Sequence, residues 1–74
     1  MAQKIQYDVL VKENGNWGIN SSHEEFEKDK AIEIAKSLEV QTNIDTVKVV
    51  REVFDSENMT TNTSTVYTPG RLWL

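Results

Sequence analysis

Hydrophobic and polar residues alternate along the first part of the chain. Over residues 4–13 every second side chain is apolar or aromatic, and these side chains share one face: Ile5, Tyr7, Val9 and Val11. A period of two in β-branched and aromatic residues is typical of a strand with one buried face. Leu10 breaks the alternation and is expected on the other face. Residues 4–13 are therefore predicted to form a half-buried strand.

The segment Asn14-Gly15-Asn16 follows this strand, and the alternation resumes at Trp17 and Ile19. Asn and Gly tolerate positive φ, so the segment predicts a hairpin turn. The length of that turn decides which face of the sheet carries the apolar residues after it, because a shift of one residue turns every side chain to the other face.

Two turn lengths are compatible with this segment. A two-residue turn would place Trp17 and Ile19 opposite the main apolar face. A three-residue loop would pair Glu13 with Trp17 and Val11 with Ile19, which unites the apolar side chains on one face. We expect burial to select the three-residue loop, with Asn16 near the left-handed conformation.

A helical period replaces the alternation over residues 28–40. Apolar side chains recur there at i, i+3, i+4 and i+7, as Ala31, Ile34, Ala35 and Leu38. This spacing predicts an amphipathic helix. Ser22 with Glu25 fits a capping box at its start. In an alternative start, Glu27 lies near the cap and Phe26 packs back as a hydrophobic staple.

Residues 44–55 are rich in valine and predict a long strand. The period of two separates Val47, Val49 and Val53 on one face from Val50 and Phe54 on the other. Residues 56–62 are polar and predict a loop. The threonine-rich segment Thr63–Thr68 suits an exposed edge strand, which Pro69-Gly70 ends.

The predicted order is strand, strand, helix, strand, strand. The simplest arrangement is an α+β fold of ββαββ type, with a four-stranded antiparallel sheet ordered 2-1-3-4 and one helix packed on one face. We expect residues 1–68 to form a single domain and residues 69–74 to form an apolar C-terminal tail.

Several stretches resemble short uncharacterised bacterial domains with this ββαββ layout. They are Tyr7-Asp8-Val9, Gly15-Asn16-Trp17, the pair Ala31 and Ala35, and residues 47–55. The resemblance covers about residues 5–68. It implies the same fold and brings no activity, cofactor or site residue with it.

The composition argues against several classes of partner and site. Eight basic and twelve acidic residues give a net charge of −4, which argues against binding to a nucleic-acid backbone. Without cysteine the chain has neither a disulfide nor a thiolate metal site. No apolar run follows Met1 as in a signal peptide, and none is long enough to span a membrane. We therefore expect a cytoplasmic protein.

Candidate catalytic chemistry is sparse. His23 is the single histidine and lies beside Glu24 and Glu25, so we expect a solvated loop histidine near the helix start. Acidic residues there complement the helix dipole. Neither a nucleophile elbow nor a glycine-rich phosphate loop occurs. We predict no catalytic residue, no metal site and no cofactor, and hence no enzyme.

Two apolar features point to an interaction surface. One is the sheet face without the helix, where Leu10, Val50 and Phe54 are expected to be exposed unless the stems of Lys12, Lys48 and Arg51 cover them. The other is the tail with Leu72, Trp73 and Leu74, whose composition suits a binding anchor. The uncharged Thr63–Thr68 strand adds an edge through which two copies can pair, so a homodimer is expected.

The sequence therefore predicts a non-enzymatic protein–protein interaction module, an accessory or regulatory protein. It binds through the outer sheet face and the C-terminal Leu72-Trp73-Leu74. One alternative is an acidic decoy or inhibitor of phage type that occupies a basic surface. Another is a small-ligand binder that uses Trp17, Tyr7 or Trp73 as a stacking surface.

Overall fold

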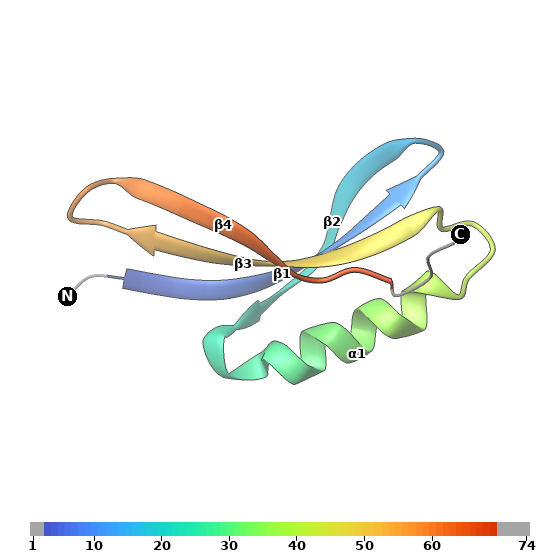
Figure 1. The fold of residues 1–74 in the computed structure, drawn as a ribbon, viewed down its shortest axis with the longest axis horizontal. Helices are drawn as coiled ribbons and strands as arrows, with labels where there is room; N and C mark the ends of the chain where they lie inside the picture. Colours follow the sequence, from blue (N-terminus) through green and yellow to red (C-terminus); the bar gives the residue numbers. More distant parts are fainter. Residues whose placement is uncertain (1–2, 70–74) are drawn as a thin grey trace.

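Four β-strands and one α-helix follow one another in the predicted order (Figure 1). The computed structural model describes residues 3–69 of the 74-residue chain. Its elements are β1 (Gln3–Glu13), β2 (Asn16–Glu24), the short 3-10 helix η1 (Glu25–Glu27), α1 (Lys28–Glu39), β3 (Thr46–Asp55) and β4 (Thr60–Tyr67). Neighbouring strands are antiparallel and the sheet order is β2-β1-β3-β4, which confirms the predicted ββαββ fold.

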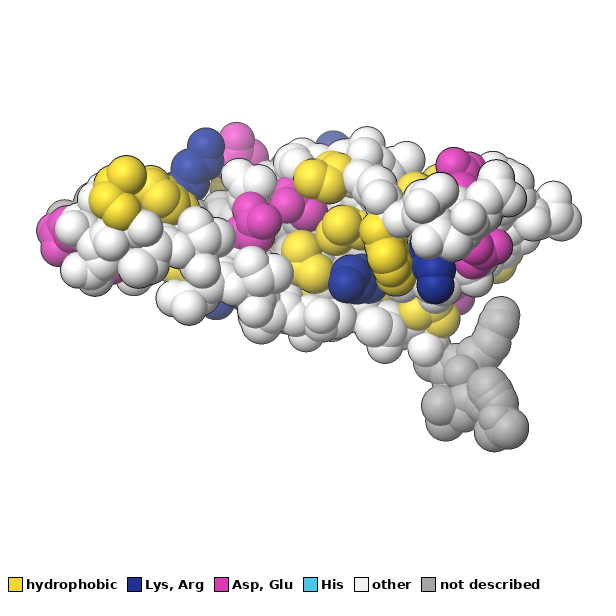
Figure 2. All heavy atoms as spheres, turned by 90° about the horizontal axis from the view of Figure 1, so that it is seen from above, with side chains coloured by type: hydrophobic (Ala, Val, Ile, Leu, Met, Phe, Trp, Pro, Cys, Tyr) yellow, Lys and Arg dark blue, Asp and Glu magenta, His cyan; other side chains and the backbone are white. Residues whose placement is uncertain are grey.

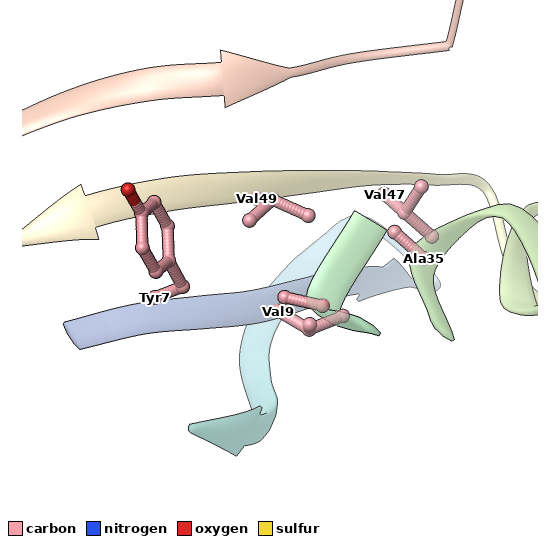
Figure 3. Packing of buried hydrophobic residues seen from close by; sticks show 6 residues of the cluster. Tyr7, Val9, Ala35, Val47 and Val49 are labelled. Carbon is pink, nitrogen blue, oxygen red and sulfur yellow. The ribbon is translucent and has the colours of Figure 1, made fainter. Parts of the chain in front are cut away.

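The core lies between α1 and the two central strands. Its buried side chains come from β1, β3 and α1, and they are Tyr7, Val9, Val47, Val49, Ala31 and Ala35 (Figure 3). The two alanines are fully buried and, being small, let the helix backbone lie close to the valines. The helical stripe and the period of two in residues 44–55 therefore meet in one core, as predicted.

The helix covers only part of the sheet. Twelve residues of α-helix span about 18 Å, against a longest dimension of 42 Å for the molecule. The start of β1 and the β3–β4 hairpin extend beyond the helix, which lies under one half of the sheet (Figure 1). The opposite face has no second layer within residues 3–69.

The turn between β1 and β2 has two residues, so the expected three-residue loop is wrong. Asn14 and Gly15 both have positive φ, of 53° and 83°, whereas Asn16 already belongs to β2. Two consecutive positive-φ residues form a turn whose twist matches that of the flanking strands. This match outweighs the burial of two apolar side chains. Trp17 and Ile19 consequently lie on the face opposite α1.

The turn is tied to the loop that leads into β3. The backbone N–H of Gly15 donates to Oδ2 of Asp45 (3.1 Å), and the backbone N–H of Asp45 donates to the carbonyl of Lys12 (2.7 Å). Nδ2 of Asn43 donates to Oε2 of Glu13 (2.7 Å). These bonds fix the hairpin end relative to the rest of the sheet.

A bulge in β2 changes the faces a second time. Val9 pairs with Ser21 and Leu10 pairs with Ile19, so Asn20 is the extra residue. Ile19 therefore shares the face of Leu10, while Ser21 and His23 lie on the face of α1.

The helix start agrees only in part with the second of the two predicted starts. The capping box is formed by Glu24 and Glu27 around η1, and the predicted pair Ser22 and Glu25 is wrong because β2 continues to Glu24. Glu27 is the N-cap residue of α1, as in the alternative start. Phe26 is 83% exposed, so the expected hydrophobic staple is wrong.

The last strand starts earlier than predicted and is joined to the end of the helix. The carboxylate of Asp55 accepts bonds from the backbone of Glu57 (2.9 Å) and the amide of Asn58 (3.1 Å), which shortens the loop so that β4 starts at Thr60. The hydroxyl of Tyr67 donates to Glu39, and this bond raises the pKa of Tyr67 to about 12.

Within residues 3–69, no helix is long and apolar enough to cross a membrane.

The turn makes a direct prediction for two glycines. Gly15→Ala forces a side chain into a positive-φ position and is expected to destabilise the fold by about 1–2 kcal/mol. Gly18→Ala is the matched control, since Gly18 is a strand residue without positive φ and its added Cβ meets no atom within 4 Å. Urea unfolding measures both variants. Equal destabilisation by the two substitutions would contradict the two-residue turn.

Candidate functional site

The outer face of the sheet, opposite α1, carries three groups of side chains. The strand registers place an apolar group there, which we call the outer-face patch: Leu10, Trp17, Ile19 and Val50. They also place there a carboxylate pair, Asp8 and Glu52, and a lysine pair, Lys12 and Lys48. Figure 2 shows this face from above: hydrophobic and basic side chains lie together near its middle with acidic side chains beside them, and further hydrophobic and basic side chains lie towards the left end.

The outer-face patch is exposed at the edge of the sheet. Trp17 is 43% exposed and Ile19 is 64% exposed, while Val50 is buried among its neighbours. Ile19 lies directly opposite Leu10. Nζ of Lys48 lies 4.7 Å from the centroid of the Trp17 ring, a cation–π contact that orders the ring without covering it from solvent.

The carboxylate pair lies beside the patch. Asp8 is only 3% exposed, and its Oδ1 accepts hydrogen bonds from Oγ of Ser22 (2.7 Å) and Nε2 of Gln6 (3.0 Å). Glu52 lies opposite Gln6, diagonally from Asp8. Burial raises the pKa of Glu52 above its ordinary value, and the negative charge of Asp8 and a hydrogen bond between the two carboxyl groups raise it further.

The three sheet residues predicted for partner binding do face outwards, but they do not form one patch. Leu10 and Val50 are diagonal neighbours. Phe54 lies opposite Lys4, with Glu52 between it and Val50 along β3. The expected contiguity is therefore wrong for Phe54.

The expected covering stems are only partly in place. Arg51 pairs with Tyr7 and so lies on the face of α1, which removes it as a cover for the outer face. Lys12 and Lys48 do face outwards. The remaining predicted binding residues, Leu72, Trp73 and Leu74, lie outside the described residues.

The expectation that Trp17 and Ile19 share the buried face is wrong, although the sequence contains a signal for their outward position. Asn-Gly is a strong indicator of a two-residue turn, and that turn alone turns both side chains outwards. The carboxylate pair has no comparable signal, because its partners come from three strands whose registers are set independently.

His23 is not the solvated loop histidine expected from sequence. It lies in β2 with its side chain only 10% exposed. Its Nε2 is 2.8 Å from Oγ of Ser21, and its Nδ1 is 3.7 Å from Oε1 of Glu27. The reason for the difference is that β2 is longer than predicted and carries His23 under the helix start.

The order serine, histidine, carboxylate resembles the arrangement of hydrolases, but the contacts differ from it. A distance of 3.7 Å is too long for the hydrogen bond that orients a catalytic histidine. Glu27 instead accepts the backbone N–H of Glu24 (3.1 Å) and lies 3.8 Å from Lys30. The pocket of about 220 Å³ at this place is lined by Lys4, Gln6, Ser22, His23, Glu24 and Glu27, and not by Ser21. We therefore assign these residues to joining β2 and α1.

Two further observations limit the chemistry of the described residues. Within residues 3–69, no three His, Asp or Glu side chains are grouped so that they can hold a metal ion. Tyr7 is buried in the core, so the expectation that it offers a stacking surface is wrong, whereas Trp17 is 43% exposed.

Comparison with known proteins adds no family: no family model, no curated protein and no solved structure matches the chain. The resemblance to short bacterial ββαββ domains stays a prediction.

The raised pKa of Glu52 predicts how stability changes with pH. Between its ordinary value of 4.5 and its raised value, the folded state binds more protons than the unfolded state. The free energy of unfolding therefore decreases as pH rises through this window. Glu52→Gln removes this decrease, so the variant is expected to gain stability relative to the unsubstituted protein on going from acidic to neutral pH.

Urea unfolding at a series of pH values measures this gain. The control is Glu33→Gln, which removes an equal charge from an exposed position of α1. Parallel pH profiles of the Glu52→Gln variant and the unsubstituted protein would contradict the account of the carboxylate pair.

Proposed function

We propose that this chain is a non-enzymatic protein-binding module, an accessory or regulatory protein, whose binding site is the outer-face patch. The observation that carries the proposal is the exposure of Trp17 and Ile19 beside Leu10, on a sheet face with no second layer within residues 3–69. Adjacent exposed apolar side chains on so small a domain are typical of an interaction surface.

The patch has the physical properties of a binding site. Covering a side chain such as Ile19 completely gains about 1.5–3 kcal/mol relative to full exposure, and part of this gain is open to a partner. Trp17 is held by Lys48 before binding, so less side-chain freedom is lost on association. Tryptophan is also among the residues that contribute most to interfaces.

The charges of the face favour an apolar interface over an acidic decoy. Both signs occur there, with Lys4, Lys12 and Lys48 set among Asp8, Glu24 and Glu52. A decoy for a basic surface needs one dominant sign. A small ligand is less well supported, because Trp17 lines neither the pocket beside His23 nor the one beside Pro69.

The module is proposed to act in the cytoplasm. Its net charge of −4 limits non-specific association there.

The first test is a comparison of two lysine substitutions in a pull-down. Protein with an N-terminal tag is used to capture partners from an extract of the source cells. Ile19→Lys places a charge in the patch and is expected to weaken capture by about tenfold or more, because an unpaired charge is then buried at the interface. Phe26→Lys is the control, since Phe26 is exposed and lies outside the patch.

Quantitative mass spectrometry measures the captured partner, and circular dichroism checks that both variants are folded. Equal capture by the Ile19→Lys and Phe26→Lys variants would exclude the patch as the binding site.

The C-terminal residues are proposed as a second anchor. Deleting Leu72, Trp73 and Leu74 is expected to abolish partner binding or self-association while the fold is retained, because β1, β3 and α1 supply the core formed by the described residues 3–69. Capture and thermal unfolding of the shortened chain measure the two effects. Unchanged association after the deletion would restrict the binding site to the sheet.

A further inference from the structure

The charges of the outer face follow a fixed order along the two central strands. In β1 the consecutive outward residues are Asp8, Leu10 and Lys12, and in β3 they are Lys48, Val50 and Glu52. Because the strands are antiparallel, the two sequences run in the same spatial direction. Each strand thus presents acid, apolar and base in that order towards the β1–β2 turn.

When a second copy faces this one with its strands running in the opposite direction, the basic end of each copy faces the acidic end of the other. A two-fold axis that lies between two facing sheets and runs across their strands reverses the strand direction. The lysine pair of one copy then lies over the carboxylate pair of the other, and the apolar residues meet in the middle. An axis parallel to the strands would place like charges together.

We propose that the outer face packs against the outer face of a second copy of this chain about such an axis. The inference rests on the proposed function and names the partner of the same patch. Facing sheets lie about 10 Å apart, with strands aligned to within about 30°. The long stem of Lys12 spans much of this gap, so its ammonium group reaches Glu52 of the other copy, while Lys48 stays over Trp17.

The second copy also resolves the electrostatics of the interface. Glu52 already lies diagonally from the carboxylate of Asp8. Covering Glu52 with an apolar partner would leave its negative charge without an opposite charge, which is strongly unfavourable. The reversed copy brings positive charges to both carboxylates and lays apolar side chains over Leu10 and Val50. It also supplies on this side a second layer that residues 3–69 do not provide.

Sedimentation velocity from micromolar to millimolar protein tests the inference. The unsubstituted chain is expected to form a dimer. Ile19→Lys is expected to raise the dimer dissociation constant by about tenfold or more, and the control Phe26→Lys to leave it unchanged.

A charge exchange tests the axis itself. Lys12→Glu and Glu52→Lys are each expected to weaken the dimer, because each places like charges opposite one another. The double variant restores opposite charges between the copies and is expected to recover most of the affinity. Circular dichroism on every variant separates loss of association from loss of fold.

Three results would overturn the inference: a monomer at millimolar concentration, a dimer that Ile19→Lys does not weaken, or a double variant no better than the single ones. A dimer broken only by Thr63→Pro, in the free edge strand β4, would assign the contact to strand pairing. If the chain is a monomer and Ile19→Lys still abolishes capture of another protein, only the homodimer is wrong. If Ile19→Lys changes neither association nor capture, the proposed function is wrong as well.

Discussion

The two-residue turn at Asn14-Gly15 determines what the molecule presents to its surroundings. Its two positive φ angles set the register of β1 against β2, and that register turns Trp17 outwards. The hydrogen bonds to Asp45 hold the same turn against the loop before β3. A local preference of two residues therefore outweighs the burial of a tryptophan and an isoleucine, and the outer-face patch follows from it.

The two faces of the sheet differ in what they contribute to the molecule. One face packs against the small side chains Ala31 and Ala35 of α1 and supplies the stability of the domain. The other carries charges that are partly compensated within the chain, with Asp8 held by Ser22 and Gln6. A face that combines compensated charge with exposed apolar groups suits association, since the binding surface is already ordered before the partner arrives.

Much of the fold is predictable from sequence because its signals are periodic. The period of two and the helical stripe identify the strands, the helix and the outward positions of Leu10, Val50 and Phe54. The candidate site is less predictable, since it depends on register. The bulge at Asn20 and the length of β2 place Ser21 and His23 on the face of α1, and neither feature leaves a periodic pattern in the sequence. The pairing of Asp8 with Glu52 requires the registers of separate strands, which no local pattern contains.

The most direct test of the account is a measurement of the β1–β2 register in solution. In a two-residue hairpin, Lys12 and Trp17 form a non-hydrogen-bonded pair whose Cα atoms lie about 4.5 Å apart. The account predicts a strong nuclear Overhauser effect between the Hα atoms of Lys12 and Trp17. Contacts that instead pair Glu13 with Trp17 and Val11 with Ile19 would place both apolar side chains under α1. The outer-face patch, and the binding function argued from it, would then be wrong.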